Sequence, residues 1–122
     1  MKTTLFVALA VFSLLLAPKV LIAEHNVVKP SIKQLIHKSA IKYGVSEEKM
    51  SNTIKCESQY NPNTVGDGGY SYGLVQIHLP SHPSVTKEQA LNPEFATDFM
   101  AENFANGKAH MWTCYRKLYK PH

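Results

Sequence analysis

The sequence predicts an α+β domain that is mostly helical and contains one small β element. Apolar residues recur at helical spacing between residues 31 and 58 and again after residue 92. Between these stretches, residues 65–77 combine the turn sequence GDGG with residues of strand propensity. The length of 122 residues, with 44% hydrophobic and 18% charged residues, is that of one globular domain. We expect helices before and after the β element to enclose a cleft.

The N-terminal segment has the pattern of a secretory signal peptide. A lysine-bearing start precedes an apolar run from Leu5 to Ala17. This run is shorter than the roughly 20 apolar residues that cross a bilayer, and Lys19 interrupts its extension. We therefore expect a signal peptide at 1–23 and a secreted or periplasmic domain at 24–122. A retained membrane anchor is the alternative.

The charge distribution argues against nucleic acid as a partner. The net charge is +4 at pH 7, and loss of Lys2 and Lys19 with the signal peptide would leave about +2. The basic residues are scattered rather than clustered in a run. A mild positive charge is compatible with an anionic polymer such as a cell wall. Membrane contact is expected only through the signal peptide.

Two helices are expected before the β element. Pro30-Ser31 opens the first and Gly44 ends it. Its apolar face is expected to comprise Ile32, Leu35, Ile36 and Ile41. Ser46 can cap the second helix, which residues 61–63 (Asn-Pro-Asn) end.

The chain after the β element predicts a loop and three further helical segments. Residues 80–83 form the loop, and residues 86–89 have the form of a capping box for a short helix. Residues 92–93 (Asn-Pro) begin a longer helix, which residues 106–107 (Asn-Gly) end. This helix is expected to bury Phe95, Phe99, Met100 and Phe104. Residues 108–119 are expected to form a final short helix.

The two cysteines predict a disulfide. In an exported chain, Cys56 and Cys114 are most simply paired, which would close a loop worth roughly 3–5 kcal/mol. A free-thiol nucleophile is the rival interpretation. It needs an activating base, and the sequence places no histidine beside either cysteine.

Glu57 continues the apolar stripe of the second helix, three residues after Ile54. It should therefore project toward the core side, where desolvation and the negative helix end both raise the pKa of its carboxyl. A carboxylic acid that stays protonated near neutral pH can donate a proton to a leaving group, as glycosidic bonds require. The alternative is a structural glutamate bonded to backbone amides of the next turn.

Read together, four short strings resemble the soluble lytic transglycosylase family of the lysozyme-like superfamily. They are Glu57-Ser58, Asn61-Pro62, GDGG at residues 66–69 and SYGLVQI at residues 71–77. The family signature is a Glu-Ser pair, an Asn-Pro turn and a Gly-Leu-Met-Gln-Ile string about sixteen residues after the glutamate. The likeness covers roughly residues 31–114 and implies a lysozyme-like domain whose β element lies beside an active-site cleft.

The resemblance implies site residues one by one. Glu57 matches the single catalytic acid/base of the family. Gln76 is a candidate substrate contact, and its alternative role is to brace the β element against the helix. Ser71 and Tyr72 are expected to face the cleft as further substrate contacts. Ser58 is expected to close the helix end through its hydroxyl.

Two departures from the family pattern bear on activity. His78 stands where many relatives carry methionine, and we assign it no role. Residues 104–107 (Phe-Ala-Asn-Gly) lack the tyrosine hydroxyl that assists the acid in many relatives. Either Tyr115 or His78 supplies that function, or the activity is reduced.

The implied function is cleavage of the β-1,4 bond between N-acetylmuramic acid and N-acetylglucosamine in peptidoglycan glycan strands. A lytic transglycosylase would use Glu57 alone and leave 1,6-anhydro ends. A lysozyme-type hydrolase would need a second carboxylate. Asp67 is the acidic residue of the β element, and in GDGG it is more simply a turn-former.

Two other classes of protein remain open. One is a non-catalytic cell-wall-binding module of the same fold, and the other is a cysteine-based amidase or peptidase acting on the stem peptide. No cofactor is implied. No metal site is implied either, because the two closely spaced histidines, His78 and His82, are separated by a stretch that contains Pro80. We expect a monomer.

Overall fold

The computed structural model describes residues 15–21, 23–24 and 26–120, so most of the predicted signal segment 1–23 lies outside the described residues. The described part is mostly helical and holds one small antiparallel sheet, as predicted. The α-helices are α1 (Ile32–Tyr43), α2 (Glu47–Ser58), α3 (Lys87–Leu91), α4 (Pro93–Ala105) and α5 (Thr113–Tyr119). The strands are β1 (Val65–Gly66), β2 (Ser71–Tyr72) and β3 (Ile77–His78). Three short 3₁₀ turns, η1 (Asp67–Gly69), η2 (Leu79–Ser81) and η3 (Ala109–Met111), connect these elements.

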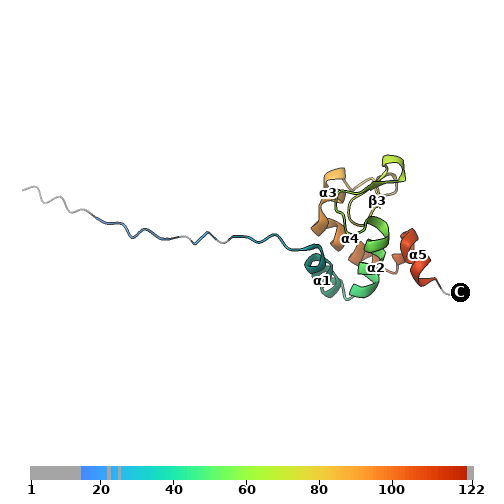
Figure 1. Ribbon diagram of the computed structural model, residues 1–122, viewed down its shortest axis with the longest axis horizontal. Helices are drawn as coiled ribbons and strands as arrows, with labels where there is room; N and C mark the ends of the chain where they lie inside the picture. Colours follow the sequence, from blue (N-terminus) through green and yellow to red (C-terminus); the bar gives the residue numbers. More distant parts are fainter. Residues whose placement is uncertain (1–14, 22, 25, 121–122) are drawn as a thin grey trace, which may run out of the picture.

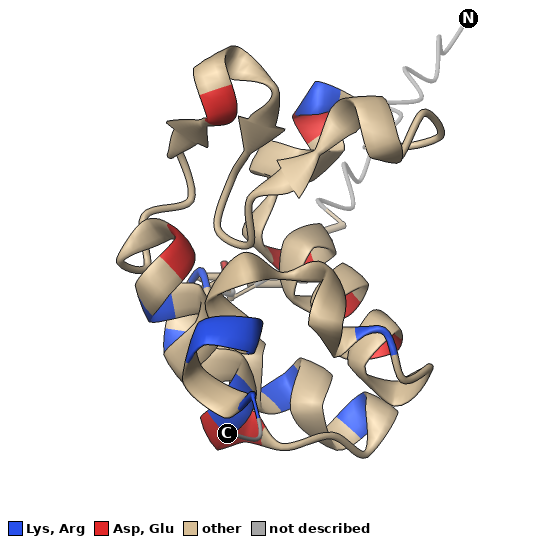
Figure 2. Ribbon diagram, turned by 90° about the vertical axis from the view of Figure 1, so that its right-hand side faces the viewer, with Lys and Arg blue, Asp and Glu red and all other residues tan. Residues whose placement is uncertain are grey.

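The helices and the sheet form two parts of one domain. Figure 1 shows the strands and α3 on one side, with α1, α2 and α5 on the other and α4 passing between them. The segment before α1 runs away from the domain. Figure 2 shows that most of the Lys and Arg residues lie on the helical side and are not gathered on one face. The scattered basic charge inferred from the sequence is therefore also scattered in space.

Local signals determine the helix ends, as the sequence predicts. Ser31 and Gln34 form a reciprocal capping box at the start of α1, and Gly44 ends that helix with φ 66°. Ser46 caps α2 through its side chain. The predicted capping box at the start of α3 and the Asn92 cap of α4 are also present. Each of these contacts lies within four residues along the chain, so the sequence carries it without tertiary information.

Two expectations about the first two helices are wrong in detail. Ile41 is 68% exposed, because α1 presents Leu35, Ile36 and Ala40 to the core and Ile41 falls beyond that face. Helix α2 ends at Ser58, three residues before the predicted stop. Gln59 adopts the left-handed conformation (φ 52°) there, and its N–H bonds to the carbonyl of Lys55.

The later helices differ from the prediction for a packing reason. The fully buried face of α4 consists of Ala96, Thr97, Met100 and Ala101. The three phenylalanines of α4 are only half-buried. The predicted final helix is split into η3 and α5, because Trp112 is extended (φ −82°, ψ 124°) and inserts its indole into the core.

The sheet is small and depends on its surroundings. Its order is β1-β2-β3, with Val65 opposite Tyr72 and Ser71 opposite His78. Each strand has two residues, too few for independent stability. The segment that joins β2 to β3 supplies the missing stability by burying Leu74 and Val75 completely.

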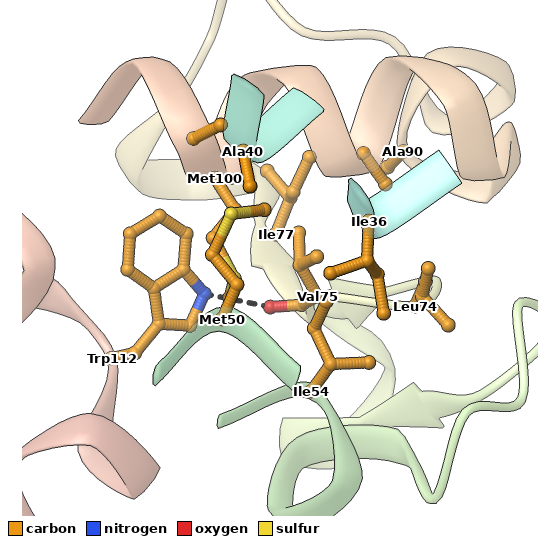
Figure 3. Packing of buried hydrophobic residues seen from close by; sticks show 12 residues of the cluster. Ile36, Ala40, Met50, Ile54, Leu74, Val75, Ile77, Ala90, Met100 and Trp112 are labelled. Atoms are coloured by element: carbon orange, nitrogen blue, oxygen red, sulfur yellow. Dashed lines mark hydrogen bonds between the residues drawn. The ribbon is translucent and has the colours of Figure 1, made fainter. Parts of the chain in front are cut away.

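Two polar side chains hold this joining segment in the core. The Ser58 hydroxyl donates to the carbonyl of Leu74 (2.6 Å), and the Trp112 indole N–H donates to the carbonyl of Val75 (2.8 Å). Figure 3 shows the Trp112 bond among the side chains of the core. Both carbonyls are thereby paired in an apolar environment, where an unpaired one would cost about 1–3 kcal/mol.

Gly73 lets the joining segment pass beneath α3. It has φ 83°, and a Cβ at this position would lie 1.9 Å from the Ala90 carbonyl oxygen. Gly73→Ala should therefore lower the free energy of unfolding by more than about 3 kcal/mol, against about 1–2 kcal/mol for Gly44→Ala. Gly44 is a matched control because it has a positive φ with open space around it. Urea denaturation measures both, and equal losses would show that the close approach is unimportant.

Candidate active site

Glu57 lies in the last turn of α2 and is half-buried. Its Oε1 accepts a hydrogen bond from the backbone N–H of Cys114, at 3.2 Å. The partner is therefore at the start of α5, far along the chain, and not in the turn after α2. This contact differs from the alternative in which the Glu57 carboxyl bonds to backbone amides of the turn after α2.

The pKa of Glu57 is raised, in the direction predicted from its place on α2. Burial is the largest cause, because it disfavours the charged carboxylate. The negative charge of Asp67 raises the pKa further. The Cys114 N–H, Lys117 and Arg116 act in the opposite direction by stabilising the carboxylate. Burial and Asp67 together outweigh these three contributions.

The carboxyl of Glu57 opens onto a cavity of about 270 Å³ between α2, the sheet and η3. The cavity is lined by Glu57, Asp67, Ser71, Gln76, His78, Ser81, Met111, Trp112 and Thr113. A second hollow of about 380 Å³ shares five of these residues and continues to His82 and Phe99. We call the two hollows together the groove. Its lining includes both polar and apolar side chains, so it can accept a ligand with both polar and apolar faces.

Two of the three predicted substrate contacts line the groove. Ser71 lies beside Glu57 but is buried, and its hydroxyl donates to Asp67 Oδ2 at 2.5 Å. Tyr72 does not line either hollow. Adjacent residues of a strand point to opposite faces of the sheet, so the expectation that both face the cleft is wrong. The Tyr72 hydroxyl instead donates to the Gly69 carbonyl, and Lys87 lies over its ring.

Gln76 lines both hollows and also braces the β element. It adopts a positive φ of 54°, and its side-chain Nε2 donates to the carbonyls of Thr64 and Gly73, each at 3.0 Å. A Cβ on Gly66 would lie 2.3 Å from Gln76 Oε1, so a side chain at position 66 would displace the braced amide. The structure therefore combines the two roles that the sequence left open, since the braced amide forms part of the groove wall.

The structure adds residues that sequence reasoning did not select. His78 lines both hollows, and its Nδ1 lies 2.8 Å from the Ser81 hydroxyl. Tyr115 does not line the cavity beside Glu57 and packs on Phe104 instead. Of the two residues considered as substitutes for the missing hydroxyl, only His78 reaches the groove. His78 lies there because the antiparallel register pairs it with Ser71. This register cannot be inferred from sequence spacing alone.

The predicted disulfide between Cys56 and Cys114 is present, with a Cα–Cα distance of 5.8 Å. Neither cysteine is free, so the free-thiol nucleophile is wrong. The crosslink joins α2 to α5 directly beside Glu57. In the described part of the chain, no helix is long and apolar enough to span a bilayer. Three or more potential metal ligands do not gather anywhere in that part either.

No family model matches the chain, and no curated protein or solved structure matches it.

Charges around Glu57 should move its pKa in opposite directions. Asp67→Asn should lower the pKa of Glu57, because it removes a nearby negative charge, and Lys117→Gln should raise it. Lys55→Gln, on the exposed side of α2, is the control and should leave the pKa unchanged. A ¹³C NMR titration of the Glu57 side-chain carboxyl measures all three. Shifts of the same sign for Asp67→Asn and Lys117→Gln would contradict the charge arrangement.

Proposed function

We propose that this protein cleaves the β-1,4 bond between N-acetylmuramic acid and N-acetylglucosamine in peptidoglycan, with Glu57 as the acid. The observation that carries the proposal is a half-buried carboxyl of raised pKa at the wall of a groove. Cleavage of a glycosidic bond needs such a group, because the sugar oxygen leaves poorly as an alkoxide. The Glu-Ser and GLVQI strings support the same reaction through their resemblance to lytic transglycosylases.

The proposed reaction is that of a lytic transglycosylase. Protonated Glu57 donates its proton to the glycosidic oxygen as the bond from C1 of N-acetylmuramic acid breaks. The resulting carboxylate then takes the proton of the C6 hydroxyl of the same sugar. The C6 oxygen bonds to C1 and leaves a 1,6-anhydro end, so Glu57 is returned to its protonated state. One carboxyl serves both steps.

The surroundings of Glu57 suit both halves of this cycle. Burial favours the protonated form that donates. The Cys114 N–H stabilises the carboxylate that remains after donation. A pKa held between these opposing influences lets one group act first as an acid and then as a base.

The arrangement of the elements supports a lysozyme-like domain. The acid lies at the end of a helix, a small antiparallel sheet follows it, and a groove runs between the two. Ser58 and the GLVQI string, which define the resemblance, contact each other through the bond from the Ser58 hydroxyl to the Leu74 carbonyl. A disulfide is compatible with the secreted or periplasmic location that the substrate requires.

Replacement of the acid tests the proposal. Glu57→Gln should reduce release of soluble muropeptides from purified peptidoglycan by about 10²- to 10⁴-fold, the usual contribution of a general acid. Glu102→Gln, an exposed glutamate on α4, is the matched control and should retain wild-type activity. Mass spectrometry of the digest measures both. If wild type and Glu57→Gln bind the wall equally and neither cleaves it, the protein is a wall-binding module.

A lysozyme-type hydrolase is the second candidate, and the position of Asp67 favours it. Asp67 lines the same cavity as Glu57 and is close enough for its charge to raise the pKa of that carboxyl. An inverting hydrolase uses a second carboxylate to activate water. The hydrogen bond from the Ser71 hydroxyl to Asp67 Oδ2, by contrast, favours a structural role for Asp67 in the turn over a catalytic one.

The products distinguish the two reactions. We expect 1,6-anhydro ends, with cleavage retained by Asp67→Asn because the transglycosylase step needs one carboxyl. The anhydro product is 18 mass units lighter than the hydrolysed one, since it lacks the added water. Reducing ends together with an inactive Asp67→Asn would assign the hydrolase reaction instead. Ser84→Ala, in an exposed turn, is the control for protein preparation and folding, and it should give the same products as wild type.

A further inference from the structure

The disulfide is joined to the proposed acid in two ways. Cys56 immediately precedes Glu57 on α2, and its partner Cys114 lies near the start of α5. The backbone N–H of that same Cys114 donates to Glu57 Oε1. One residue is therefore bonded covalently to the neighbour of Glu57 and hydrogen-bonded to its carboxyl.

The N–H of Cys114 is available to Glu57 because of its place in α5. It is the second residue of that helix, where backbone N–H groups have no acceptor within the helix. Trp112 precedes α5 in an extended conformation, so the chain turns toward α2 at this point. The Glu57 carboxyl satisfies one of the free donors that every helix start leaves.

Two anchors hold the short segment 112–114 in place. On one side the Trp112 indole is buried and bonds to the Val75 carbonyl. On the other side the disulfide ties Cys114 to α2. The other hydrogen bond between α5 and α2 in the described residues lies at the far end of α5, where Asn52 donates to the Tyr119 hydroxyl and Lys49 lies over the Tyr119 ring. At the level of Glu57, the disulfide is therefore the covalent link between the two helices, beside the hydrogen bond to Glu57 itself.

We propose that the Cys56–Cys114 disulfide positions the acid of the proposed reaction by holding the Cys114 N–H against Glu57, in addition to stabilising the fold. The inference rests on the proposed function for its catalytic consequence. Its structural part, the dependence of the Glu57–Cys114 hydrogen bond on the crosslink, can be measured without any substrate.

Loss of the crosslink would change the surroundings of Glu57 in two opposing ways. The groups that face this carboxyl are Asp67 and His78 from the sheet side, and Arg116 and Lys117 from α5. If α5 moves away, Glu57 loses the N–H donor and two positive charges, which favours the protonated carboxyl, but it also becomes less buried, which favours the carboxylate. The decisive observation is therefore whether the residue 114 amide still follows the ionisation of Glu57.

The first experiment uses the wild-type protein. In a ¹H–¹⁵N NMR pH titration, the Cys114 amide proton should shift with the same midpoint as the ¹³C signal of the Glu57 carboxyl. This shift should be absent in Glu57→Gln. A Cys114 amide that does not follow Glu57 would overturn the proposal, and no altered disulfide is needed to see it.

The second experiment removes the crosslink. In Cys56→Ser/Cys114→Ser, the residue 114 amide should no longer shift with the ionisation of the Glu57 carboxyl. Ile36→Ala is the control, because it removes buried side-chain volume on the α1 side of the core and should lower thermal stability without changing the titration. A residue 114 amide that still shifts with Glu57 in the folded double variant would overturn the proposal.

Activity completes the test. At the optimum, kcat should fall on the order of 10- to 100-fold in the double variant, because the acid is no longer held in place. The alkaline limb of its pH profile should follow the Glu57 midpoint that NMR gives for the same variant, which a loss of stability alone would not produce. Wild-type protein that shows the NMR coupling but leaves the wall uncut would overturn the proposed function and leave the coupling intact. Ile36→Ala should keep the wild-type pH profile.

Discussion

The fold depends on pairing the backbone of one irregular, buried segment. Residues 73–76 join β2 to β3 through the core, where the buried carbonyls of Leu74 and Val75 each need a donor. Ser58 from α2 supplies one donor and Trp112 from the start of α5 supplies the other. Two helices far apart in sequence are thereby joined to the same short segment. The two-residue strands persist because this segment is held, since strands so short bring little stability of their own.

The same constraint builds the groove. The held segment turns at Gln76, whose positive φ directs its side chain toward Thr64 and Gly73 while it also forms part of the groove wall. Trp112 contributes to both the core and the groove, because its indole is buried between them. Gln76 and Trp112 thus both stabilise the sheet region and shape the proposed binding surface. Substitutions there would affect stability and binding together.

Opposing influences on one carboxyl give the site its chemical character. Glu57 lies on the same face of α2 as Met50 and Ile54. These two side chains are buried, so this face is the core side of the helix. Burial raises its pKa, and the Cys114 N–H limits that rise. Neither influence is available to a glutamate on an exposed helix face. The disulfide matters to this balance because it ties the donor to the helix that carries the acid.

The sequence by itself determined the features that depend on near neighbours. Helix starts at Ser31, Ser46 and Asn92 follow from side chains that bond to backbone groups two or three residues away. The inward placement of Glu57 follows from the 3.6-residue period. The pairing of two cysteines follows from their number in a chain with a signal-like start. These are local or combinatorial constraints, so no tertiary information is needed to read them.

Only the tertiary structure decided which residues share the groove with Glu57. Spacing did not separate Ser71, which lines it, from Tyr72, which lies on the other face, because the face depends on strand register. His78 enters the groove through that same register. The bond from Cys114 to Glu57 joins residues 57 positions apart. Such contacts arise from the packing of whole elements, and no local pattern of residue types records that packing.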